Sequence, residues 1–136
     1  MNNREQVLFN TIKSFLTDKK PNAWQSSKDR VETSGNEDVT VLYWDDATHP
    51  KSHAEVSHYN EIFHFDRKTG KWHINNHGYC GKMSVTRINV CLNAAGLEYM
   101  CFISKGRFCM RNWKTQKSWI CGDGEVTSAE VSKAGI

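Results

Sequence analysis

The chain lacks the features that define several protein classes. No window approaches the roughly 18 apolar residues that a membrane-spanning helix needs. The first residues, MNNREQ, do not form a basic start followed by an apolar stretch, as a secretory leader would. Internal repeats, a second domain and a complete catalytic signature are also missing from the pattern. We therefore expect a cytoplasmic protein that makes no contact with membranes.

The cysteines do not form a disulfide or zinc-finger framework. There are five, an odd number, and no two are spaced as CxxC. Several fall in apolar segments, where a free thiol behaves as a small hydrophobic group. We expect reduced, structural cysteines at Cys80, Cys91, Cys101, Cys109 and Cys121.

Large apolar side chains are plentiful, by contrast. The chain of 136 residues contains five Trp, six Phe and four Tyr. A chain of this size buries about two-thirds of its unfolded surface. One domain with a substantial core is therefore expected.

The most informative stretch begins with an amphipathic helix. Ser84 is a suitable N-cap, and Gly96 is a suitable left-handed residue after the C-terminus. Between them, apolar residues recur at helical spacing: Ile88, Cys91, Leu92 and Ala95.

A hairpin is expected directly after this helix. Two apolar runs, Tyr99–Ser104 and Arg107–Trp113, flank the turn-forming pair Lys105-Gly106. If Ser104 lies opposite Arg107, one face of the ribbon carries Phe102, Ser104, Arg107, Cys109 and Arg111, and Ile103 and Phe108 lie on the other. A short strand at Ser118–Cys121 would extend the ribbon.

The preceding part of the chain predicts one helix and two further hairpins. The helix covers Asn3–Lys19 and ends before a proline. The hairpins pair Arg30–Thr33 with Val39–Trp44, and Tyr59–Asp66 with Lys71–Asn75. If Phe65 lies opposite Trp72, then His64 lies beside His73 on the less apolar face of the second hairpin.

Together these elements predict a single α+β domain over residues 1–121, followed by a frayed tail over 122–136. Its antiparallel sheet would contain about six strands built from hairpins, with two helices against it, in the order α-β-β-β-β-α-β-β. The expected core residues are Leu8, Ile12, Phe15, Val41, Phe63, Phe65, Trp72, Ile74, Ile88, Leu92, Ile103 and Phe108.

All six histidines fall between residues 49 and 77. His73, His77 and Cys80, with a fourth ligand such as His64, offer the nitrogen and sulfur atoms that zinc prefers. However, the spacing is not that of a known zinc site, and residues three apart on a strand face opposite ways. An exposed polar sheet face explains the same residues, so we expect no cofactor and retain zinc as the alternative.

A hydrolytic site is a weaker hypothesis. Asp45, Asp46, His49 and His53 include the groups that bind Mg²⁺ and act as a general base. An acidic pair before a loop is, however, more often a turn signal. Cys80 lies near His77 without an identifiable oxyanion hole or orienting group. We therefore expect a protein that is not an enzyme.

The distribution of charge is the strongest functional clue. The net charge is +3, but between residues 82 and 121 the only acidic residue is Glu98. The basic residues of this segment are Lys82, Arg87, Lys105, Arg107, Arg111, Lys114 and Lys117. Such residues can follow a phosphate backbone, while Trp113 or Trp119 stacks on an unpaired base. A solvated basic face over buried tryptophans would contain the same residues.

Residues 59–123 also carry a family resemblance. Short motifs recur in the order Tyr59, Gly70, Gly78-Tyr79, Thr86-Arg87-Ile88-Asn89, Gly96-Leu97-Glu98-Tyr99 and Gly122-Asp123-Gly124. This order resembles small bacteriophage-encoded accessory proteins without an assigned activity. The resemblance implies an accessory role, in the host cytoplasm, and no particular chemistry.

The function expected from the sequence is therefore non-enzymatic binding of nucleic acid by a phage-type accessory protein, through the basic helix and hairpin. The alternative is inhibition of a host defence or nucleic-acid-processing protein, because aromatic residues and Arg are the usual anchors of protein interfaces. A zinc-binding protein or metal-dependent enzyme using residues 49–80 is the third hypothesis.

Overall fold

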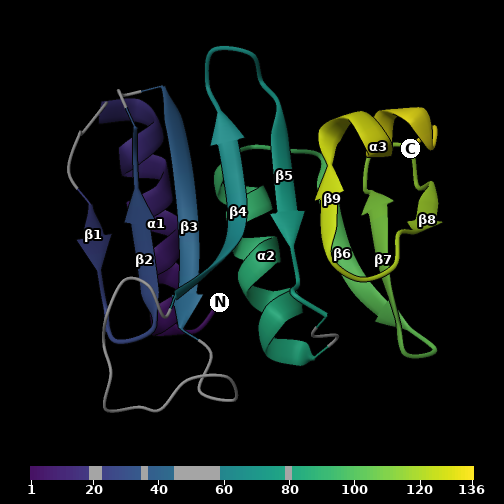
Figure 1. Cartoon of the computed structure of the whole chain (residues 1–136), viewed down its shortest axis with the longest axis horizontal. Helices are drawn as coiled ribbons and strands as arrows, with labels where there is room; N and C mark the ends of the chain where they lie inside the picture. Colours follow the sequence, from purple (N-terminus) through teal and green to yellow (C-terminus); the bar gives the residue numbers. More distant parts are fainter. Residues whose placement is uncertain (19–22, 35–36, 45–58, 79–80) are drawn as a thin grey trace.

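The computed structural model describes residues 1–18, 23–34, 37–44, 59–78 and 81–136, and its elements form two antiparallel sheets and three helices (Figure 1). In chain order these are α1 (Asn3–Asp18), β1 (Trp24–Gln25), β2 (Asp29–Glu32), β3 (Asp38–Trp44), β4 (Tyr59–Asp66), β5 (Trp72–Asn75), α2 (Lys82–Ala94), β6 (Tyr99–Ser104), β7 (Arg107–Asn112), β8 (Ser118–Ile120), β9 (Glu125–Thr127) and α3 (Ser128–Lys133). The α+β class predicted from the sequence is confirmed.

The larger sheet has the strand order β1-β2-β3-β4-β5-β9, and α1 and α2 lie side by side behind it (Figure 1). Its predicted hairpins form, and Phe65 pairs with Trp72, which places His64 opposite His73 as expected. Alternation along the strands sends Val41, Phe63 and their same-face neighbours toward the helices. The open face therefore keeps the polar residues.

The second sheet, β6-β7-β8, corrects the prediction of one continuous sheet. The reason is a side chain of α2. Asn89 accepts a hydrogen bond from the Cys101 N–H at 2.7 Å and donates one to the Cys101 carbonyl at 2.9 Å. These bonds satisfy the backbone groups of Cys101 in the middle of β6, at the edge that faces away from β7, where a further strand would otherwise pair.

The C-terminal residues also differ from the prediction of a frayed tail. β9 pairs with β5, and α3 starts with a capping box in which Thr127 and Glu130 satisfy each other's backbone N–H groups. Val126 and Val131 are buried in the core. Short as they are, these elements complete the larger sheet and cover its end.

Helix α2 begins three residues earlier than predicted. Its N-cap is Gly81, which offers no side chain to the helix, rather than Ser84. The helix is held by burial instead, since Ile88, Cys91 and Leu92 have no exposed surface. Gly96 has a φ of 72°, as expected for the residue that follows a helix.

The predicted core is confirmed with two differences in degree: Phe65 and Ile103 are half-buried against it, and the other predicted residues are buried. No helix within the described residues is both long enough and apolar enough to cross a membrane.

Candidate nucleic-acid interface

The three-stranded sheet has one face in the core and one face toward solvent. Cys101, Phe108 and Met110 are buried in the core, and Ile103 and Trp119 pack against them. Strand alternation places the intervening residues on the opposite side. We call this side the outer face; its residues are Met100, Phe102, Ser104, Arg107, Cys109, Arg111, Ser118 and Ile120.

Basic side chains lie along the outer face and at one end of it. Arg107 is exposed next to the hairpin turn, where Lys105 (φ 52°) and Gly106 (φ 74°) both adopt the left-handed conformation of a tight two-residue turn. Arg111, four residues along β7, donates a hydrogen bond to the Gln116 side chain. The predicted pairing of Ser104 with Arg107 is confirmed.

A second basic group lies at the other end of β7. Trp113 is 50% exposed, and the Lys114 ammonium lies 5.6 Å from the centre of its ring. The buried Asn112 side chain holds this turn, because its oxygen accepts the N–H groups of Lys114 and Thr115. From Lys105 to Trp113 the strand rise gives a length of about 25 Å.

Between the two basic ends, the outer face carries apolar groups and a pocket. Met100 and Ile120 are 39% and 56% exposed, and Phe102 is half-buried. A pocket of about 630 Å³ is lined by Phe102, Ser104, Lys105, Arg107, Cys109, Ser118, Trp119 and Ile120. The sequence contains no Asp or Glu from Tyr99 to Cys121, so no strand of this sheet carries a negative side chain.

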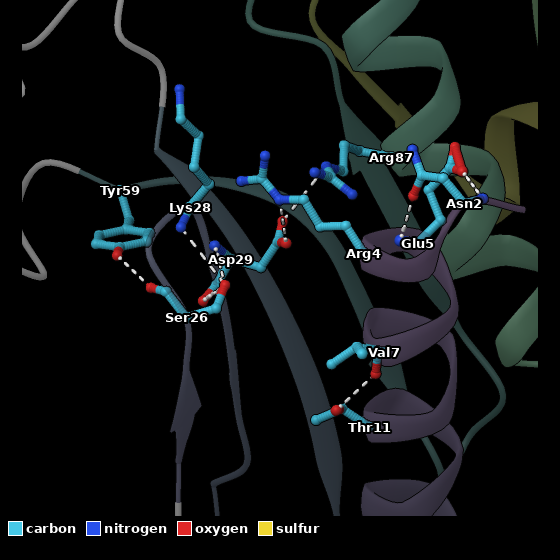
Figure 2. A network of polar contacts seen from close by, with 10 residues as sticks. All are labelled: Asn2, Arg4, Glu5, Val7, Thr11, Ser26, Lys28, Asp29, Tyr59 and Arg87. Carbon is cyan, nitrogen blue, oxygen red and sulfur yellow. Dashed lines mark hydrogen bonds and ion pairs between the residues drawn. The ribbon is translucent and has the colours of Figure 1, made fainter.

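Arg87 does not belong to this exposed basic surface, contrary to the prediction. It is 4% exposed and lies in the second turn of α2, where its Nε is 3.4 Å from Asp29 Oδ1. Its guanidinium carbon is 5.4 Å from the centre of the Tyr43 ring. Figure 2 shows Arg87 and Arg4 approaching Asp29 from α2 and α1. The carboxylate of Asp29 therefore links both helices to β2 through ion pairs.

In the cluster formed by Asp29, Arg87 and Arg4, burial has the largest effect on the ionisation of the Asp29 carboxyl. Loss of water raises the pKa of the Asp29 carboxyl above its ordinary value, and the nearby charges of Arg87, Arg4 and Lys28 offset only part of this shift. The cluster therefore fixes the packing of α1 and α2 on the sheet. Arg87 itself is too deeply buried to contact a phosphate in the folded protein.

The positions of three further predicted contact residues can be compared with the prediction. Trp119 pairs with Met110 and is half-buried, so that its side chain packs against the core and also contributes to the lining of the pocket. Lys82 is exposed at the start of α2, as expected. Trp113, on the other hand, is as accessible as predicted.

Two of the histidines, His64 and His73, form a cross-strand pair on the larger sheet. The rings of His64 and His73 stack with their centres 5.1 Å apart. Each faces its own carboxylate, His73 at 2.7 Å from Glu61 and His64 at 3.6 Å from Asp38. Among the residues that the structure describes, no three His, Cys, Asp or Glu side chains are grouped as metal ligands.

Of the remaining members of the zinc and hydrolase hypotheses, the structure describes only His77. His77 Nε2 lies 2.5 Å from the backbone oxygen of Glu61. Cys80, and the candidates Asp45, Asp46, His49 and His53, lie outside the described residues.

The four cysteines in the described segments are free thiols, and three of them are buried. Burial raises the pKa of Cys91 and of Cys101, and raises that of Cys121 to about 12. Since the thiolate is the reactive form, these residues are suited to packing rather than to nucleophilic chemistry. This agrees with the structural role expected from the sequence.

No family model matches this chain, and neither a curated protein nor a solved structure shows significant similarity to it.

Proposed function

We propose that this protein binds nucleic acid on the outer face of the β6-β7-β8 sheet. The observation that carries the proposal is the combination of Arg107, Arg111, Lys105 and Lys114 along a segment without any acidic side chain. A phosphate backbone complements such a surface, because the three strands carry cations and no carboxylate. Glu98, directly before β6, lies at the Trp113 end, where its carboxylate accepts a hydrogen bond from the Asn112 side chain. The role is non-enzymatic and fits the phage-type accessory function expected from residues 59–123.

The exposed apolar groups favour nucleic acid over a purely solvated face. A surface that only maintains solubility gains nothing from leaving Met100, Ile120 and Trp113 accessible among its cations. Nucleic-acid sites combine positive charge with flat or apolar side chains that contact sugars and bases. The lysine over Trp113 shows both kinds of group within one contact.

The test is the affinity for a fluorescently labelled oligonucleotide of about 12 nucleotides, within the usual size of such sites. We expect Arg107→Glu to weaken binding strongly. The matched control is Lys68→Glu, which makes the same change of charge at an exposed turn of the other sheet. Equal effects of both substitutions would mean that binding depends only on the net charge of the protein and would contradict a site on the outer face. Absence of binding by the unmodified protein would refute the proposal.

The host-inhibitor alternative makes a different prediction for the same chain. If a host protein is the target, a tagged protein retains one stoichiometric protein partner from host lysate after nuclease treatment. If nucleic acid is the target, nuclease removes what was captured.

A further inference from the structure

We infer that the pocket on the outer face receives an unpaired nucleobase, so that the nucleic acid bound there is single-stranded. This inference rests on the proposed function and adds the class of nucleic acid. It starts from the pocket beside the hairpin turn, whose volume of about 630 Å³ lies within the range of sites for small organic ligands.

The lining of the pocket divides into three chemical parts. Its apolar part comes from all three strands and consists of Phe102, Trp119, Ile120 and the largely buried Cys109. Hydroxyl groups are available at Ser104 and Ser118. This combination fits a flat heterocycle, which needs apolar contact for its face and hydrogen-bonding groups for its edge.

The third part is the positive charge of Lys105 and Arg107, which line the same pocket. A nucleotide whose phosphate contacts either side chain brings its base within reach of Phe102. A neutral or cationic aromatic ligand would gain nothing from these charges. Charge complementarity thus favours a nucleotide as the occupant, and the proposed function makes it one residue of a bound strand.

A duplex cannot use this pocket in the same way. Its bases are paired at their edges and covered on their faces by stacking, so a base reaches the pocket only after leaving the helix. An unpaired strand exposes its bases without that cost. The pocket consequently favours single strands, while the basic side chains alone would bind phosphates of either form.

Phe102 is the residue that distinguishes these two modes of binding. It lies on the outer face, opposite the core, and pairs with Cys109 of the central strand. Phe102→Leu keeps an apolar side chain and all charges but removes the aromatic ring. Phe9→Leu is the matched control, because it makes the same change at a half-buried phenylalanine of α1, which lies outside both the pocket and the outer face.

The experiment compares affinities for one sequence as a single strand and as a duplex, at a fixed salt concentration. For the unmodified protein we expect the single strand to bind at least about tenfold more tightly. Loss of the stacking contact in Phe102→Leu should weaken single-strand binding by roughly 5- to 150-fold. Duplex binding and the salt dependence of Phe102→Leu should be unchanged, and Phe9→Leu should bind both strand forms as the unmodified protein does.

A measurement on the unmodified protein covers the case in which the variant fails to fold. A single strand containing the fluorescent base 2-aminopurine should show a saturable change in emission when it binds. Equal affinity for both strand forms, or no emission change at any position of the probe, would overturn the inference while leaving salt-dependent binding intact. Absence of binding to either form would instead refute the proposed function.

Discussion

The ion pair between Arg87 and Asp29 allows a quantitative test of the packing of this fold. Arg87 is 4% exposed and Asp29 is 1% exposed, so neither charge is solvated when its partner is removed. Replacing Arg87 with Met keeps an unbranched side chain and leaves the carboxylate without its nearest cation. Breaking a buried pair in this way costs about 3–5 kcal/mol.

Arg4 provides the internal comparison. Its Nε lies 3.9 Å from the other oxygen of Asp29, but its side chain is 41% exposed. Ion pairs with this degree of exposure contribute no more than about 1 kcal/mol. Arg4→Met should therefore lower the free energy of unfolding by much less than Arg87→Met.

The double variant Asp29→Leu with Arg87→Met tests the cause of the loss. Because desolvation of the carboxyl exceeds the attraction of its neighbours, replacing both charges by apolar groups should restore most of the stability lost in either single variant. The assay is urea unfolding of the four proteins of this cycle at pH 7. Additive losses in the double variant, or a loss below about 1 kcal/mol for Arg87→Met, would refute this reasoning.

The pH dependence of the same pair has a defined sign. The folded-state pKa of Asp29 is raised above its ordinary value of 3.8. Its protonation therefore contributes stability that is fully present below about pH 3.8 and is lost as pH rises through the folded-state pKa. The difference in free energy of unfolding between Arg87→Met and the unmodified protein should accordingly become smaller as pH falls through this window.

Three further predictions concern other parts of the fold. Asn89→Ala should lower the free energy of unfolding by about 1–3 kcal/mol, because buried backbone groups of β6 lose their partners, whereas the exposed Asn93→Ala should not; urea unfolding measures both. Cys121, with a pKa of about 12, should have a thiolate fraction of about 10⁻⁴ at pH 8 and react slowly with iodoacetamide, and rapid labelling detected by mass spectrometry would contradict its burial. Truncation after Cys121 removes the buried Val126 and Val131 and should cost about 3–6 kcal/mol, whereas a frayed tail would be lost without effect on the melting temperature.

Local periodicity accounts for the parts of the fold that the sequence predicted. The helix at Asn3–Asp18 and the hairpin containing Phe65 and Trp72 each bury one face whose pattern spans a whole element. The pair Lys105-Gly106 is typical of a two-residue hairpin turn. Placing the turn there predicted the register of the outer face correctly. Elements that depend on such local patterns need no tertiary information.

The errors arise where tertiary contacts decide the structure. Arginine is usually exposed, so the sequence predicts a surface position for Arg87. Only the folded chain brings it next to Asp29, which is distant in the sequence. The division into two sheets likewise depends on Asn89, whose side chain occupies a strand edge. Helix α3 had a signal that was missed, because Thr127 and Glu130 have the spacing of a capping box.

The candidate interface was predictable in its charges but not in its shape. Lys105, Arg107 and Arg111 follow from the sequence and the hairpin register. The pocket and the inward position of Trp119 depend on how β8 joins the sheet. The proposal therefore assigns the main stacking contact to Phe102, while the half-buried Trp119 also lines the pocket.

The salt dependence of oligonucleotide binding tests the central claim most directly. Phosphate contacts from Lys105, Arg107, Arg111 and Lys114 would give a slope of about −3 for log affinity against log salt with a single strand, or a loss of about 50-fold between 50 and 200 mM. Arg107→Ala should make this slope shallower by about 0.7, and Lys68→Ala should leave it unchanged. Binding that does not depend on salt, or the same slope in Arg107→Ala, would contradict the account.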